Sequence, residues 1–303
     1  MTPAGTPAAS GPVGASGGAL DEPVAASPRA AGPSGRRAAA GTVVYEPGAL
    51  ERALREGRDA GRKLVVPYVT GGLGPAWGAV VAAVAAAGAD AVEIGIPFSD
   101  PIMDGPTIQE ASTRALAAGA TPAGLLAELR QLDADVPLVV MTYYNLVLRA
   151  GHERFARWLA ASNVAGAIVP DLPLDEASPW ATEAAAHGVE NVLLAAPTTP
   201  DDRLRRICEA TRGFVYGVGL MGVTGERAAL AQSAAVMGDR LKAVTDKPVL
   251  IGVGVSTPEQ ARAVCEHADG VVVGSALVRR LLEGGGPEEA ASFVAGLRRA
   301  LDG

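Results

Sequence analysis

The stretch that decides the fold is Val249-Leu250-Ile251-Gly252-Val253-Gly254-Val255-Ser256-Thr257-Pro258-Glu259. It opens with an uninterrupted apolar run, which is typical of a strand in a parallel sheet covered by helices on its outer face. Two glycines follow, and then a helix start in which Ser256 or Thr257 is the N-cap and Pro258 and Glu259 occupy the first turn. The sequence therefore predicts a buried strand that passes directly into a helix.

The same unit recurs along the chain from Glu46 onward. We predict eight strands: Leu64–Val69, Ala91–Gly95, Leu138–Thr142, Gly166–Val169, Asn191–Ala195, Phe214–Gly217, Val249–Val253 and Gly270–Val273. Each precedes an Ala-, Leu- and Arg-rich helical stretch, and Thr121-Pro122 predicts an extra helix at Ala123–Leu132. Strand then helix, eight times in about 250 residues, predicts an α/β fold of the (β/α)8 TIM-barrel class. An open doubly wound sheet is the competing fold, but the first strand–helix unit lacks its glycine fingerprint.

Residues 1–44 have a different composition, rich in Pro, Ala, Gly and Ser. Such a segment buries too little apolar surface to offset its ordering entropy, so we predict a disordered extension before a barrel domain at 45–303. Arg36-Arg37 suggests a twin-arginine export signal. The apolar stretch that follows is too short for one and contains Glu46.

Bulk composition excludes several function classes. The 303 residues carry a net charge of −7, which argues against a nucleic-acid partner or an anionic membrane. No apolar run reaches the ~18 residues of a membrane span. The two cysteines, Cys208 and Cys265, form no disulfide framework or metal spacing, and we expect them reduced in a cytoplasmic protein.

Glu93 is the leading catalytic candidate, because it is a carboxylate at the C-terminal end of an apolar strand. Catalytic groups of these barrels lie at strand C-termini, and an unpaired buried carboxylate is too costly to be incidental. Apolar surroundings should raise its pKa and make it a proton donor near neutral pH. In the following loop, Asp100 and Asp104 serve either as turn and cap residues or as acceptors for a substrate N–H.

The loop after the sixth predicted strand is unusually rich in glycine. It runs Gly217-Val218-Gly219-Leu220-Met221-Gly222-Val223-Thr224-Gly225 and contains a literal G-x-G-x-x-G. A dinucleotide site would place that motif in the first unit, opening a helix. A lid that closes over a substrate is the better interpretation.

The loops after the last two strands predict a phosphate site. Gly254 lies in the first loop, and Gly274 and Ser275 lie in the second. These loops commonly bind phosphate in such barrels through backbone N–H groups at a helix N-terminus. Tight strand-to-helix packing without a ligand is the alternative. The three histidines, His152, His187 and His267, lie away from the strand ends, so we predict no metal site.

Together these motifs resemble the tryptophan synthase α-chain family. The resemblance covers roughly residues 46–303 and is most specific from Glu93 to Gln109. It is carried by Pro67–Thr70, Glu93–Pro101, Asp104–Gln109, Tyr143–Asn145, Asp171–Pro173, Gly222–Gly225, Gly252–Gly254 and Gly274-Ser275.

The resemblance implies a lyase of tryptophan biosynthesis that cleaves indole-3-glycerol phosphate to indole and glyceraldehyde 3-phosphate by a retro-aldol reaction. It implies that Glu93 is the acid–base group, that Asp104 holds the indole N–H, and that Tyr216 lies near the catalytic glutamate. The implied pocket contacts are Tyr68 and Thr70, and the implied phosphate contacts are Gly225, Val253, Gly254, Gly274 and Ser275. No metal or organic cofactor is implied for this step; pyridoxal phosphate belongs to the β subunit of an α2β2 complex.

Two departures from the family keep other functions open. Many members carry polar residues where this chain has Gly217–Met221, and the extension is atypical. The altered lid favours a stand-alone lyase that releases free indole for specialised metabolism. The segment Ile96–Pro106, which resembles a partner-facing loop, favours an α subunit instead. A non-catalytic barrel that activates a β partner is disfavoured by the presence of both Glu93 and Asp104, and another phosphosugar barrel would need a metal set or a lysine at the strand ends.

Overall fold

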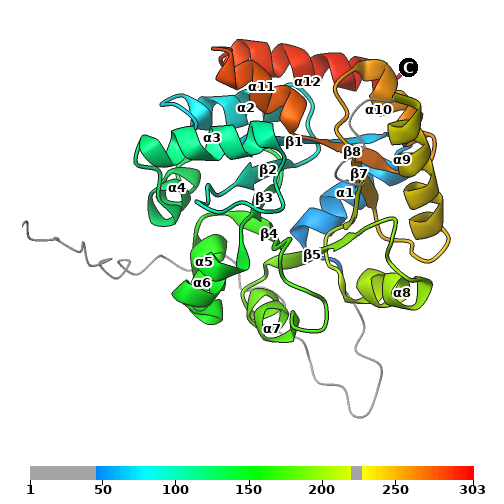
Figure 1. The fold of residues 1–303 in the computed structure, drawn as a ribbon, viewed down its shortest axis with the longest axis horizontal. Coiled ribbons are helices and arrows are strands. Elements are labelled where there is room, and N and C mark those ends of the chain that lie inside the picture. The colour runs from blue at the N-terminus through cyan, green and yellow to red at the C-terminus, as the bar shows by residue number, and fades with distance from the viewer. Residues whose placement is uncertain (1–45, 220–226) are drawn as a thin grey trace, which may run out of the picture. The chain divides into compact units, whose positions relative to one another are not determined.

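The computed structural model describes residues 46–219 and 227–303, and its centre is a closed barrel of eight parallel strands. Neighbouring strands are consecutive in sequence, and β8 pairs with β1 to close the ring (Figure 1). The strands are β1 Leu64–Thr70, β2 Val92–Gly95, β3 Leu138–Met141, β4 Val164–Ile168, β5 Glu190–Ala195, β6 Val215–Val218, β7 Val249–Gly252 and β8 Gly270–Val273. The predicted TIM barrel is confirmed, and each predicted strand overlaps an observed one.

Helices surround the strands on the outside of the ring, except α1, which covers one end of the barrel (Figure 1). They are α1 Ala49–Asp59, α2 Trp77–Ala86, α3 Pro106–Ala117, α4 Pro122–Leu129, α5 Tyr144–Ala150, α6 His152–Ala161, α7 Ser178–Ala186, α8 Asp201–Ala210, α9 Arg227–Lys242, α10 Pro258–Cys265, α11 Ser275–Leu282 and α12 Pro287–Leu301. The extra helix predicted after Thr121 is α4, and the Thr121 side chain accepts the Gly124 N–H. Of the two N-caps proposed for α10, Thr257 is the one used, in a capping box with Gln260.

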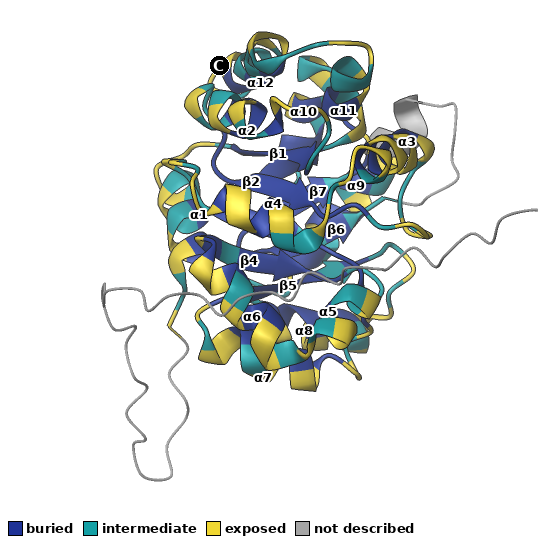
Figure 2. Ribbon diagram, turned by 90° about the vertical axis from the view of Figure 1, so that its left-hand side faces the viewer, coloured by how far each residue is buried: buried dark blue, intermediate teal, exposed yellow. Residues whose placement is uncertain are grey.

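The strands separate two apolar layers. Side chains such as Val65 and Val69 point outward and pack under the helices, whereas Leu64, Val66 and Phe214 point into the barrel. Figure 2 shows the strands mostly buried, while the helices expose one face. Side chains thus fill the interior of the barrel below the C-terminal ends of the strands. Those ends are therefore the place for chemistry.

Helix α1, which the sequence analysis did not assign, packs against the barrel interior. Its Leu50 and Leu54 are fully buried among the inward-facing strand residues. The carboxylate of Glu190, at the start of β5, accepts the backbone N–H groups of Leu50 (2.6 Å) and Glu51 (3.2 Å). An anionic group at the N-terminus of a helix satisfies otherwise unpaired donors, so Glu190 fixes the first turn of α1.

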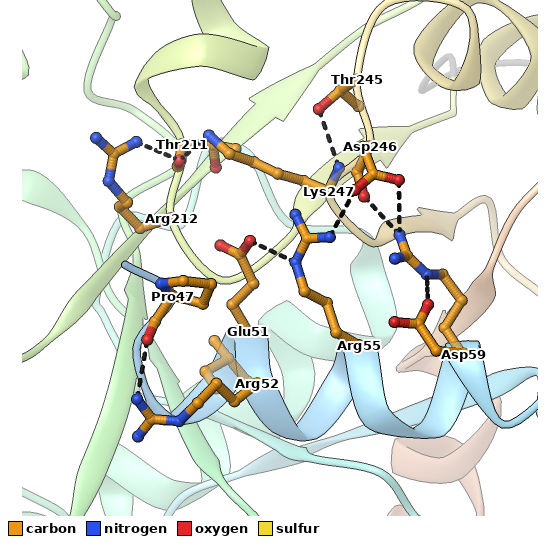
Figure 3. A network of polar contacts seen from close by, with 12 residues as sticks. Pro47, Glu51, Arg52, Arg55, Asp59, Thr211, Arg212, Thr245, Asp246 and Lys247 are labelled. Carbon is orange, nitrogen blue, oxygen red and sulfur yellow. Dashed lines mark hydrogen bonds and ion pairs between the residues drawn. The ribbon is translucent and has the colours of Figure 1, made fainter. Parts of the chain in front are cut away.

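A polar network ties the other side of α1 to the loops that precede β6 and β7 (Figure 3). Arg55 bonds to Glu51 and Asp246, both at 2.8 Å, and Arg58 donates to the Asp246 carbonyl. The Lys247 ammonium donates to backbone carbonyls at the end of α8 and just beyond it. These contacts lie at the N-terminal ends of the strands, away from the C-terminal ends where the chemistry is predicted. We therefore infer that they hold α1 in place.

Among the described helices, none is long and apolar enough to cross a membrane. The predicted extension, residues 1–44, lies outside the described residues.

Candidate functional site

Glu93 lies on the inner side of β2, near the C-terminal end of the strand. Its register partners are Tyr68 on β1 and Val139 on β3. Only 1% of the residue is exposed, and neither carboxylate oxygen has a hydrogen-bond partner among the described residues. Burial, helped by the nearby charge of Asp104, raises the pKa of Glu93 to about 8. Glu93 therefore holds its proton at neutral pH.

Asp104 comes from the loop between β2 and α3, and it faces the same region. Its pKa is raised to about 6 by burial, with the Tyr143 hydroxyl acting in the opposite direction. The two carboxyl groups consequently differ in state near pH 7, where Asp104 is mostly ionised and Glu93 is protonated. A pair of carboxyl groups whose surroundings separate their pKa values is a common arrangement for acid–base chemistry.

Two tyrosines complete the wall around Glu93. Tyr68 and Tyr216 lie on β1 and β6, and burial is the largest cause that raises the pKa of each phenol. A Cβ at Gly95 would overlap the Tyr68 ring, and one at Gly252 would overlap the Tyr216 ring. Glycine at these two inward-facing positions is what lets both neutral phenols pack beside Glu93.

Thr70, the last residue of β1, contributes a second unpartnered polar atom. The residue is fully buried, and its hydroxyl oxygen has no hydrogen-bond partner within the described part of the chain. Buried polar groups are rarely left unpaired, so the hydroxyl of Thr70 and the carboxyl of Glu93 mark a place where a polar ligand would restore hydrogen bonds.

The predicted phosphate residues lie at the ends of two neighbouring strands. β7 pairs with β8, Val253 and Gly254 follow β7, and Gly274 and Ser275 follow β8. Gly254 has φ +75°, a left-handed conformation that favours glycine. Ser275 is exposed at the first position of α11, whose first-turn N–H groups lack intrahelical acceptors. Backbone donors thus face the barrel mouth at a helix N-terminus.

Some predicted residues fall elsewhere. Gly225 and the lid residues Leu220–Thr224 lie outside the described residues. Asp100 is exposed on the loop and accepts a hydrogen bond from the Ser99 hydroxyl, which fits the turn role rather than the catalytic one. In the described ranges, no group of histidine, cysteine, aspartate and glutamate could hold a metal ion.

Tyr143 lies beside the candidate site, although from the sequence it had a place in a motif and no role. It lies two residues beyond the end of β3, it is buried, and its hydroxyl acts on Asp104. Its position just beyond a predicted strand was the available clue, since strand C-termini carry the chemistry in this fold.

Comparisons with known proteins agree with this geometry. The family model described as tryptophan synthase alpha chain matches residues 54–298. Among curated relatives, the tryptophan synthase alpha chain of Halorhodospira halophila is 45% identical over 263 residues, which cover 84% of this chain and 96% of the relative. That of Gloeobacter violaceus is 49% identical, covering 71% of this chain and 78% of the relative.

Solved structures give the same result. A structure of Mycobacterium tuberculosis tryptophan synthase has a TM-score of 0.78 and 40% identity, covering 84% of this chain and 99% of the other. The alpha subunit from Legionella pneumophila has a TM-score of 0.77 and 30% identity, covering 85% and 99%.

Proposed function

Because this chain belongs to the tryptophan synthase α-chain family, we propose that Glu93 and Asp104 are the groups with which it cleaves its substrate. The chain is a lyase that converts indole-3-glycerol phosphate into indole and glyceraldehyde 3-phosphate in tryptophan biosynthesis. The observation that carries the assignment is the buried Glu93 carboxyl, protonated and without a partner, beside an Asp104 that ionises about two pH units lower.

The two carboxyl groups divide the chemistry between them. Glu93 donates its proton to the indole ring carbon that bears the glycerol chain, which turns the ring into a leaving group. Positive charge then develops on the ring nitrogen, and the Asp104 carboxylate stabilises it by accepting the N–H. The Glu93 carboxylate just formed takes the proton of the neighbouring glycerol hydroxyl as the carbon–carbon bond breaks. Glu93 thereby recovers its proton, and indole and the aldehyde are released.

The remaining residues orient the substrate. The backbone N–H groups around Gly254, Gly274 and Ser275 bind the phosphate, and Val253 lines that end of the site. Tyr68 and Tyr216 flank the indole, and the Thr70 hydroxyl pairs with a polar group of the glycerol chain. Binding the phosphate away from the reacting carbon fixes the scissile bond against Glu93, which is how remote binding energy lowers a barrier.

The partner is the tryptophan synthase β subunit, with which α chains form an α2β2 complex. The reaction of this chain requires no cofactor, and pyridoxal phosphate belongs to the β subunit. We place the protein in the cytoplasm, since Cys208 and Cys265 are both free and buried in the described part of the chain.

The test is indole release from indole-3-glycerol phosphate by the purified chain, alone and with a β subunit. Weak turnover alone that rises sharply with the β subunit is expected of an α chain. Full turnover without a partner would indicate a stand-alone lyase. No indole under either condition would refute the lyase function.

A further inference from the structure

Tyr143 connects the end of β3 to the loop that carries Asp104. The residue precedes α5, and only 4% of it is exposed. Its ring stacks on Phe98 with centroids 5.0 Å apart and an interplanar angle of 24°. Phe98 lies at the start of the loop between β2 and α3 and Asp104 lies near its end, so the tyrosine lies against both parts of the loop.

The hydroxyl oxygen of Tyr143 accepts one hydrogen bond, and its hydrogen remains to be donated. The Met103 N–H can only donate, and it does so to the hydroxyl oxygen at 2.9 Å. A phenol has one hydrogen to give, and the carboxyl group of Asp104, the residue after Met103, is the acidic group that acts on it most strongly. Burial and the charge of Asp104 raise the pKa of Tyr143, so the phenol keeps that hydrogen.

We propose that Tyr143 is a positioning residue: anchored by the Met103 N–H and by stacking on Phe98, its phenol donates a hydrogen bond to the Asp104 carboxylate, holds it toward the substrate and favours its ionised form. The inference rests on the proposed lyase function, in which Asp104 must accept the indole N–H. A hydrogen bond to an ionised group is stronger than a neutral one, and it favours the ionised form of the carboxyl group.

A second anchor fixes the same loop without touching the carboxylate. Gln109 on α3 donates from its amide to the Asp104 backbone carbonyl at 2.9 Å. The backbone of Asp104 is therefore fixed from α3 and its side chain from β3. Of these two anchors, only Tyr143 should affect the protonation of the carboxyl group.

Other titratable groups surround Tyr143 and Asp104. Asp171, from the loop after β4, raises the pKa of Tyr143, and Tyr143 in turn raises that of Tyr68. Glu93 and Tyr216 lie within reach of the Asp104 charge. Burial raises the pKa of Asp104, and the hydroxyl of Tyr143 opposes that rise. Removing the hydroxyl should therefore make Asp104 protonate at higher pH.

The effect is readable in the pH dependence of kcat/KM. Activity should fall on the acid side as pH drops through about 6, because Asp104 must be ionised. It should fall on the alkaline side as pH rises through about 8, because Glu93 must be protonated. Loss of the phenol should move the acid limb upward and leave the alkaline limb in place.

The experiment is Tyr143→Phe, which keeps the ring stacked on Phe98 and removes only the hydroxyl. Tyr144→Phe is the matched control, because the hydroxyl of Tyr144 pairs with His152 at 3.0 Å instead. We expect Y143F to lower kcat/KM roughly tenfold at pH 7, in line with a charged hydrogen bond. Its acid limb should shift to higher pH, whereas Y144F should shift neither limb.

A direct readout keeps this proposal separate from the lyase function. The titration of the Asp104 carboxyl, followed by carbon NMR and assigned with Asp104→Asn, should move to higher pH in Y143F. An unmoved titration and an unmoved acid limb would overturn the positioning role, even if Y143F lost stability. Absence of indole release by the wild type would refute the lyase function, and the NMR titration would still decide the role of the hydroxyl.

Discussion

Replacing Glu93 by glutamine should abolish indole release and at the same time stabilise the protein at neutral pH. Glutamine keeps the shape of the side chain but cannot transfer the proton, so turnover should fall by at least the ~10²–10⁴-fold typical of a lost acid–base group. The gain in stability follows from the burial of a carboxyl group that has no partner in the described part of the chain.

The magnitude comes from the pKa of Glu93, which burial raises from 4.5 to about 8. Below pH 4.5 the group is protonated whether the chain is folded or unfolded, so it has no effect on stability. Between these pH values only the unfolded chain releases the proton, and the wild type loses about 1.4 kcal/mol of stability per pH unit. At pH 7 the loss amounts to about 3 kcal/mol, and it is complete above pH 8.

The assay is urea unfolding of the wild type and E93Q at pH 5, 7 and 8, with the denaturant dependence checked for two-state behaviour. The two proteins should differ by less than about 1 kcal/mol at pH 5, and E93Q should be about 3 kcal/mol more stable at pH 7. Glu56→Gln, at an exposed position of α1, controls for the change in net charge. A stability gap that stays constant with pH would refute the assignment of a protonated, buried Glu93.

Three other substitutions test separate parts of the structure. Asp104→Asn should lower kcat/KM by about 10²–10³-fold, because a half-buried loop carboxylate that stabilises developing charge is lost. It should also raise Tm at pH 7, because burial raises the pKa of Asp104 to about 6 and the ionised carboxylate therefore costs stability there. Ser275→Asp should raise KM for the phosphorylated substrate about tenfold or more by repulsion, yet leave Tm equal or slightly higher, since an acidic residue suits the first turn of a helix; an unchanged KM would remove Ser275 from the phosphate site. Glu190→Ala should lower the free energy of unfolding by about 1–3 kcal/mol, because the Leu50 and Glu51 N–H groups lose their acceptor; calorimetry measures the change, and no loss would contradict the role given to Glu190.

Much of the fold was predictable because its rules are local. Apolar runs, glycines at strand ends and caps such as Thr121 and Thr257 each act over a few residues. Repeated eight times, they leave the barrel as the arrangement that buries every strand. Helix α1 was not assigned, because it precedes the first predicted strand and so lies outside the repeated strand–helix unit. Only the assembled barrel shows that Leu50 and Leu54 reach its interior.

For the site, the sequence by itself determined which residues are candidates. Glu93 stood out because a carboxylate inside an apolar strand is costly, and Gly254, Gly274 and Ser275 stood out because a strand end is followed by a helix. Those arguments need only the neighbours in sequence.

The tertiary structure alone decided how these groups act on one another. Closing the barrel brings β1, β2 and β6 together, so that the side chains of Tyr68, Glu93 and Tyr216 lie close enough to act on one another. It also places Tyr143, two residues beyond β3, against the loop after β2, where its hydroxyl acts on Asp104. Burial and through-space charge set the protonation of a group, and both depend on residues distant in sequence. The sequence therefore determined the residue types, their positions along the strands and the direction in which the pKa of Glu93 moves, whereas the tertiary structure determined how Asp104, Tyr143 and Glu93 affect one another.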